Sequence, residues 1–199
     1  MEIQSMTRSA FLARGAVAVG AAYGAGAVAP FVGTALASST DVDIVNFALT
    51  LEYLEAAFYT QAVQKVPGLK GDVLKLAKDL RDNEQQHVSA LKATVKQLGG
   101  TPVTAPGVDF GGAFKSETTF LKYANTFEDT GVSAYNGAAP AISSPDVLAA
   151  AGSIVQVEAR HAALIRLQRG VTPAPLAFDK SSDKAAVLAA VKPFIKAAM

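Results

Sequence analysis

The chain has 199 residues, half of them hydrophobic, which is enough for one domain with a sizeable core and too few for two ordinary ones. Its net charge is only +1, so no basic surface points to nucleic acid as a partner. The absence of cysteine excludes disulfides, cysteine-type zinc sites and thiol catalysis. Alanine, leucine and valine dominate the apolar residues, which favours an all-α chain.

Residues 1–37 differ in composition from the rest of the chain. Arg8 and Arg14 come before an Ala-, Gly- and Val-rich stretch that contains no acidic residue and ends in "ALA" before Ser38. This pattern predicts a signal peptide with a small-x-small cleavage site, and a membrane anchor that is never cut is the alternative. "TRSAFL" resembles a twin-arginine export signal, but Ser9 occupies the place of the second arginine. We therefore expect an exported protein that is periplasmic, in the cell envelope or secreted. The sequence does not decide between export routes.

Two antiparallel helical hairpins are predicted from apolar residues that recur at helical spacing. The first hairpin consists of helices over about 41–65 and 71–98, which only "VPGLKG" separates. The second consists of helices over about 116–136 and 144–169, and the fourth helix begins with an N-cap serine followed by proline. No segment shows the alternation of apolar and polar residues that is typical of strands.

About 17 residues, rich in glycine and proline, connect the two hairpins. Fully extended, they could span ~55 Å, whereas a helix of 25 residues is ~38 Å long. The connection can therefore cross the whole bundle and start the third helix at the opposite end. A simple up-and-down bundle with a loose loop is the alternative.

A short fifth helix is expected from about Ser182, after "GVTPAPLAFD". We expect it to dock on the bundle rather than on a membrane. Four apolar residues are predicted on one side of it: Val187, Val191, Phe194 and Ile195. The expected organisation is a signal peptide (1–37), a four-helix bundle (38–170) and a C-terminal extension (171–199).

Both histidines of the chain follow a glutamate by three residues, as Glu84 and His87 on the second helix and Glu158 and His161 on the fourth. Positions i and i+3 share one helix face, so each pair can present a carboxylate and an imidazole to the same small volume. With seven glutamates among 199 residues, both histidines would have this neighbour by chance about once in 800 such chains. The two pairs therefore predict two halves of one site.

The first and third helices offer glutamates in apolar surroundings, where burial is costly unless a metal or a proton compensates it. Counting from the hairpin turns, Glu52 and Glu128 fall level with the Glu-x-x-His pairs. Glu55 is either an extra or alternative ligand, or an acid beside the ligands or on the surface. Tyr59 and Tyr135 lie seven residues after Glu52 and Glu128. Their hydroxyls can hydrogen-bond a ligand carboxylate or a nearby water, or they are simply core tyrosines.

These segments carry a family resemblance over roughly residues 41–170. "LEYLEAAFY", "NEQQHV" and "VEARHA" are similar to helices of rubrerythrin, and the chain resembles exported bacterial ferritin-like domain proteins related to plant desiccation-related proteins. The resemblance implies an all-α ferritin-like four-helix bundle and two metal ions bridged by carboxylates, and the short C-terminal helix is an addition to this bundle. Six residues fill the ligand roles: Glu52, Glu84, His87, Glu128, Glu158 and His161. The chain lacks rubrerythrin's cysteine-bound iron domain, and its export signal and extra helix weaken the analogy to ferritin storage cages.

A ligand set of carboxylates with two imidazoles suits iron best and manganese next, and zinc can occupy such a site adventitiously. The resemblance implies oxygen or peroxide as a further partner. We expect no nucleic acid as a partner and no stable membrane insertion after cleavage of the signal peptide, and a homodimer is a candidate assembly. The leading hypothesis is an exported ferroxidase-like or peroxide-consuming oxidoreductase in iron or oxidative-stress handling. A non-enzymatic stress or envelope protein with a structural or vestigial metal site is the alternative, and an iron-storage shell is a weaker one.

Overall fold

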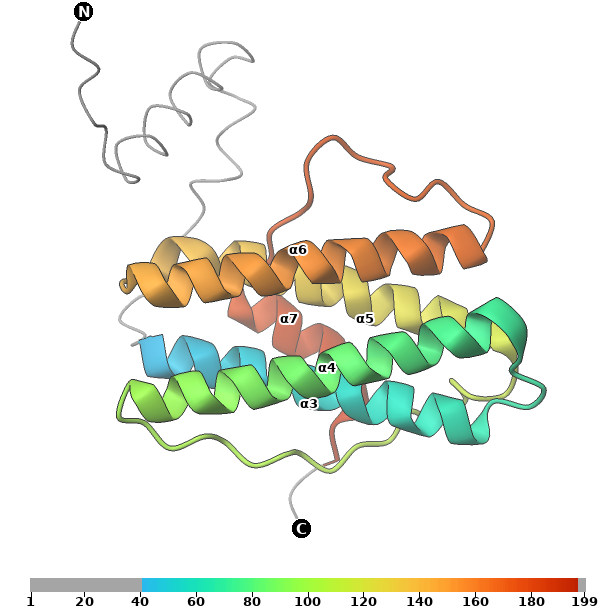
Figure 1. Ribbon diagram of the computed structural model, residues 1–199, viewed down its shortest axis with the longest axis horizontal. Coiled ribbons are helices and arrows are strands. Elements are labelled where there is room, and N and C mark those ends of the chain that lie inside the picture. Colours follow the sequence, from blue (N-terminus) through green and yellow to red (C-terminus); the bar gives the residue numbers. More distant parts are fainter. Residues whose placement is uncertain (1–40, 197–199) are drawn as a thin grey trace, which may run out of the picture. The chain divides into compact units, whose positions relative to one another are not determined.

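The computed structural model describes residues 41–196, which form a bundle of helices (Figure 1). The predicted signal peptide lies outside these residues. The predicted all-α class and the four long helices are confirmed, with helix ends within two residues of the expected ones. No helix among the described residues is both long and apolar enough to cross a membrane. In chain order the elements are α3 (Asp41–Lys65), α4 (Gly71–Gln97), α5 (Glu117–Ala138), the 3-10 turn η2 (Ala139–Ala141), α6 (Pro145–Gln168), α7 (Lys184–Val191) and the 3-10 turn η3 (Lys192–Phe194).

The predicted pairing into two hairpins and a long crossover is present. Helices α3 and α4 pack side by side, as do α5 and α6, and Figure 1 shows the connection between α4 and α5 running along the bundle to its other end. Gly99, with φ of +78°, ends α4, since this left-handed conformation is open to glycine. Ser116 and Ser144 cap α5 and α6, each accepting a hydrogen bond from a backbone N–H in the first turn.

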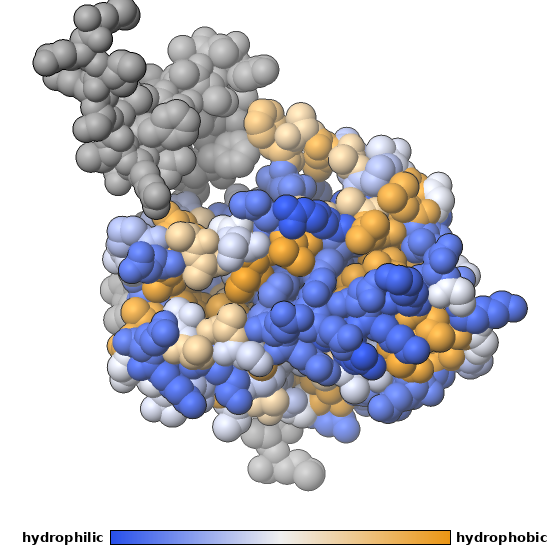
Figure 2. Space-filling view, viewed as in Figure 1, coloured by the Kyte–Doolittle hydropathy of each residue, from blue (hydrophilic) through white to orange (hydrophobic). Residues whose placement is uncertain are grey.

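Two apolar clusters divide the core along the bundle, whereas hydrophilic residues cover much of the bundle face shown in Figure 2. One end, which we call the aromatic end, is built around the rings of five phenylalanines: Phe58, Phe110, Phe114, Phe120 and Phe127. The other, the aliphatic end, is built from smaller side chains: Val45, Leu49, Leu91, Val95, Val147 and Ile154. The buried glutamates of the helices lie between these two ends along the sequence of each helix.

The C-terminal extension packs on the bundle and contacts the crossover connection between α4 and α5. Val187 and Val191 of α7 are buried in the aromatic-end core, as expected. Phe194 and Ile195 do not continue that helix, so this part of the prediction was wrong: α7 ends at Val191, because Pro193 follows and an α-helix interior does not accommodate proline. Instead Ile195 forms an antiparallel bridge with Val108 of the crossover.

Helix α5 and the extension come into close backbone contact at Gly137. A Cβ added there would lie 1.9 Å from the backbone oxygen of Ser182, whose own N–H donates to the Ser133 carbonyl at 2.9 Å. We expect Gly137→Ala to push the extension away and to lower the free energy of unfolding by about 1–3 kcal/mol, measured by urea denaturation.

Gly152→Ala in α6 is the matched control for this substitution. A Cβ at Gly152 would meet nothing within 4 Å, and alanine is the better helix former, so this variant should be as stable as the wild type or more so. An equal loss of stability in both variants would contradict the role assigned to the contact at Gly137.

Candidate metal centre

Five glutamates and two histidines from four helices meet in the middle of the bundle. Each glutamate is at most 3% exposed, which is rare for this residue type. Helices α4 and α6 each contribute one Glu-x-x-His pair, and the remaining glutamates come from α3 and α5: Glu52, Glu55 and Glu128. The structure thus brings together all the residues that the sequence singled out as ligands.

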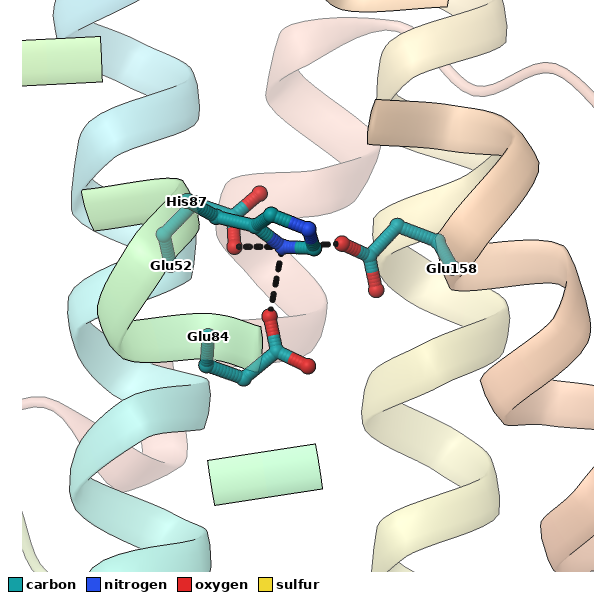
Figure 3. Close-up of side chains that lie close together, drawn as sticks. All are labelled: Glu52, Glu84, His87 and Glu158. Atoms are coloured by element: carbon teal, nitrogen blue, oxygen red, sulfur yellow. Dashed lines mark hydrogen bonds and ion pairs between the residues drawn. The ribbon is translucent and has the colours of Figure 1, made fainter. Parts of the chain in front are cut away.

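Three carboxylates surround the ring of His87 (Figure 3). Its Nδ1 lies 3.2 Å from Glu52 Oε2, 2.9 Å from Glu84 Oε2 and 2.9 Å from Glu158 Oε1. The three glutamates belong to three different helices, so only the folded bundle creates this group.

His161 has an equivalent set of neighbours. Its Nδ1 lies 3.0 Å from Glu84 Oε1 and 3.4 Å from both Glu128 Oε2 and Glu158 Oε2. Glu84 and Glu158 therefore each direct one oxygen to one histidine and the second oxygen to the other. The two imidazole rings are stacked at an interplanar angle of 27°, with centroids 6.2 Å apart.

The donor atoms fall into two groups, each of a size that could hold one metal ion. Within a group, the ligand atoms all lie within 4.8 Å of one another. One group contains Glu52 and His87, the other contains Glu128 and His161, and both include Glu84 and Glu158. Two carboxylates shared between two groups is the arrangement that a bridged pair of metal ions requires.

The hydrogen bonding inside the centre fits metal ions better than it fits the protein alone. Among the described residues, five buried side-chain atoms have no hydrogen-bond partner, and all five belong to this centre: Glu84 Oε1, Glu128 Oε2, both Glu158 oxygens and His161 Nδ1. Buried polar atoms without partners are costly, so such a concentration calls for an explanation. Hard oxygen donors with imidazole nitrogen suit iron and manganese, which would satisfy these atoms together.

Burial and mutual repulsion raise the pKa of most of the carboxyl groups. Burial, followed by the charge of Glu158, raises the pKa of Glu52 and Glu55 well above the ordinary value. Burial likewise raises the pKa of Glu128 to about 8, although His161 opposes the rise. Without metal, the centre therefore retains protons on groups that are normally ionised at neutral pH.

The two imidazoles lower the pKa of a neighbouring carboxyl group, whereas burial raises it. Burial opposes the ionisation of Glu84, but the adjacent His161 and His87 imidazoles outweigh it and lower the pKa of Glu84 to about 2. Burial disfavours the charged imidazoles, yet the surrounding carboxylates raise the pKa of both histidines to about 12. Because a metal binds neutral imidazole and ionised carboxylate, loading the centre must release these protons.

Two tyrosines connect the hairpins to each other through the glutamates. The Tyr135 hydroxyl of α5 donates to Glu52 Oε1 of α3 at 2.6 Å, and the Tyr59 hydroxyl of α3 donates to Glu128 Oε1 of α5. Burial and the adjacent carboxylate raise the pKa of each phenol well above its ordinary value, so each hydroxyl keeps its proton and donates. The two hydrogen bonds are reciprocal, and each orients one carboxylate toward its histidine.

Glu55 stands apart from both groups of donor atoms. It is buried, but it contributes to neither set of ligand atoms that could hold a metal. Its carboxylate packs against Gly131, where an added Cβ would lie 3.3 Å from Glu55 Oε1. Gly131 follows Glu128 by three residues, just as Glu55 follows Glu52, so the two positions are equivalent in the two hairpins. The first hairpin has an acid at this position, and the glycine of the second hairpin leaves space for its side chain.

Asn83 belongs to the centre and was missed by the sequence analysis. Its side-chain nitrogen lies 3.0 Å from His161 Nε2, the ring nitrogen that faces away from the carboxylates. With the amide turned by 180°, Asn83 Oδ1 accepts the Nε2–H and leaves Nδ1 free for a metal. Adjacency to Glu84 was the only signal in the sequence, and it does not reveal a contact with another helix. The equivalent residue on α6 is Val157, which has no polar side-chain atom.

We expect Asn83→Leu to weaken metal binding by about 10–100-fold, because His161 would lose the partner that sets its orientation and tautomer. Anaerobic titration with Fe²⁺ or Mn²⁺, followed by calorimetry, measures this affinity. Gln85→Leu is the control, since Gln85 is exposed on the same helix. Equal affinities of the two variants would show that Asn83 does not support His161.

Comparison with known families agrees with this geometry. The family model of the ferritin-like domain matches residues 40–171 of the sequence. This span includes α3 to α6 and every residue of the centre, but not α7. No curated protein matches the chain significantly. The fold of two hairpins with a long crossover, the shared carboxylates and this match over most of the chain lead to one conclusion. The chain belongs to the ferritin-like domain family.

Proposed function

We propose that this protein is an exported di-metal carboxylate protein that oxidises Fe²⁺ or consumes peroxide, in iron or oxidative-stress handling. The observation that supports the proposal is the pair of donor groups that share Glu84 and Glu158. In this proposal, Glu52 and His87 hold one ion, Glu128 and His161 hold the other, and the two shared carboxylates bridge them.

The charges of the proposed ligands match two divalent ions. Four ionised glutamates offset two doubly positive ions when both imidazoles are neutral. Two bound iron ions, each cycling by one electron, would supply the two electrons that convert H₂O₂ and two protons into two molecules of water, or O₂ and two protons into H₂O₂. Iron is the proposed metal, and manganese is the alternative.

The residues around the ligands would keep the centre rigid and dry. Tyr135 and Tyr59 hold the terminal carboxylates by hydrogen bonds from opposite hairpins. Asn83 holds the ring of His161, which is the more buried of the two histidines: its side chain is 3% exposed, against 11% for that of His87. The aromatic and aliphatic ends of the core limit access of bulk water along the bundle.

Loss of metal and of oxidation in one variant tests this function. The mature wild type should bind about two Fe²⁺ per chain and oxidise them in air or with peroxide, whereas Glu84→Ala should bind one or none, because both donor groups lose an oxygen ligand. Elemental analysis and the absorbance of Fe³⁺ measure the two quantities.

Glu117→Ala is the matched control, since Glu117 lies in the first turn of α5, away from the centre. It should retain the metal content and the oxidation rate of the wild type. A folded wild type without metal after incubation with Fe²⁺ or Mn²⁺ would refute the proposal, and metal binding without oxidation would favour a structural site.

We also propose export, with a relationship to the desiccation-related type of ferritin-like protein, from the pattern of residues 1–37 and its "ALA" ending. The full-length chain, expressed in a bacterium, should be recovered from the envelope or medium with a mass that corresponds to a chain starting at Ser38. Recovery of the uncut chain from the cytoplasm would contradict export, and recovery of the uncut chain in membranes would favour an anchor.

A further inference from the structure

A small cavity lies at the aliphatic end of the bundle, beside the metal centre. It encloses about 30 Å³, and each of the four long helices contributes to its wall. One lining residue from each helix is enough to place it: Ala48 of α3, Leu91 of α4, Tyr135 of α5 and Ala151 of α6. This volume is far below the ~300 Å³ of sites for drug-sized ligands, so only a molecule of a few atoms fits.

The cavity is one to two helical turns from the metal centre. Ala48 comes four residues before Glu52 and Leu91 comes four residues after His87, a rise of ~6 Å along each helix. Tyr135 joins the two places directly, because its ring lines the cavity and its hydroxyl donates to Glu52 Oε1. A molecule in the cavity is therefore separated from the centre by little more than this side chain.

The wall of the cavity offers nothing for water to bind. Only two lining side chains carry a polar atom, and both atoms are already engaged: the Thr94 hydroxyl donates to the Ala90 carbonyl and the Tyr135 hydroxyl to Glu52. A buried water needs two to four polar partners, and cavities without them stay dry and take up apolar molecules such as xenon. The wall therefore favours an apolar diatomic molecule over water or peroxide.

The two ends of the bundle differ in how they are closed. At the aromatic end, fully buried rings such as Phe58 and Phe120 fill the core. At the aliphatic end, five residues lining the cavity are only half-buried, among them Ala48, Thr94 and Ala151. The bundle is thus more accessible to small molecules at the aliphatic end.

We propose that this cavity is a binding site for dioxygen, from which the gas passes Tyr135 to the metal centre. The delivery step rests on the proposed function, because it requires a centre that uses dioxygen. The affinity of the cavity for a small apolar gas does not depend on that function, and it can be measured on the metal-free protein.

Xenon is the probe for the cavity itself. Wild-type crystals under xenon pressure should show one xenon atom among Ala48, Leu91, Tyr135 and Ala151, and ¹²⁹Xe NMR in solution should show the same binding. Ala151→Leu should abolish the binding by filling the space, and Ala149→Leu, an equal substitution at an exposed position two residues away, should not. Ala48→Leu fills the cavity from α3 and serves if Ala151→Leu does not fold. Absence of xenon from the wild type would overturn the proposal, whatever the iron activity.

Oxidation of Fe²⁺ at several oxygen concentrations tests delivery. Ala151→Leu should raise the KM for dioxygen severalfold while leaving the metal content and the rate with peroxide as in the wild type, and Ala149→Leu should change none of these. An unchanged KM in a variant that has lost xenon binding would overturn delivery through the cavity. If the wild type binds xenon but oxidises no Fe²⁺, the proposed function fails and the gas site stands.

Discussion

The rest of the structure depends on the placement of five buried carboxyl groups, one buried imidazole and one half-buried imidazole inside an apolar bundle. Burying charged groups in such surroundings costs free energy unless the groups are paired or bound to a metal, and apolar packing alone does not compensate that cost. The bundle meets this constraint by surrounding each imidazole with three carboxylates and by donating one phenol to each terminal glutamate. What this pairing leaves unsatisfied is a set of oxygen and nitrogen atoms directed at two shared positions.

The two hairpins are near-equivalents in the centre, and their differences indicate which positions are specialised. The reciprocal hydrogen bonds of Tyr59 and Tyr135 follow the symmetry, as do the Glu-x-x-His pairs. The acid at position 55 and the space at Gly131 break it. So do the aromatic and aliphatic ends, one filled with rings and the other containing a cavity. Two metal ions held here would therefore have different neighbours and different access, although their ligand sets are alike.

Membership of the ferritin-like family accounts for the scaffold, whereas the chemistry depends on the side chains that the scaffold carries. Helices α3 to α6 place four glutamates and two histidines at one level, which suits two ions that exchange electrons with oxygen or peroxide. The C-terminal extension lies beyond the family match, yet it packs on the bundle and pairs with the crossover. It therefore stabilises the connection that sets the direction of the second hairpin.

The sequence by itself determined the helices, their pairing and the candidate ligands, because these follow from apolar periodicity, the lengths of the connections and the spacing of the glutamates and histidines. Apolar spacing, capping serines and the glycine pair after α4 are short-range signals, and Glu-x-x-His is a same-face pattern on one helix. Tertiary structure alone decided which atoms meet. Glu52 and Glu55 are one turn apart, and only packing against α4, α5 and α6 placed Glu52 among the ligand atoms and Glu55 beside Gly131. The contact of Asn83 with His161 and the cavity beside Tyr135 likewise arise between helices, where no single helix carries the information.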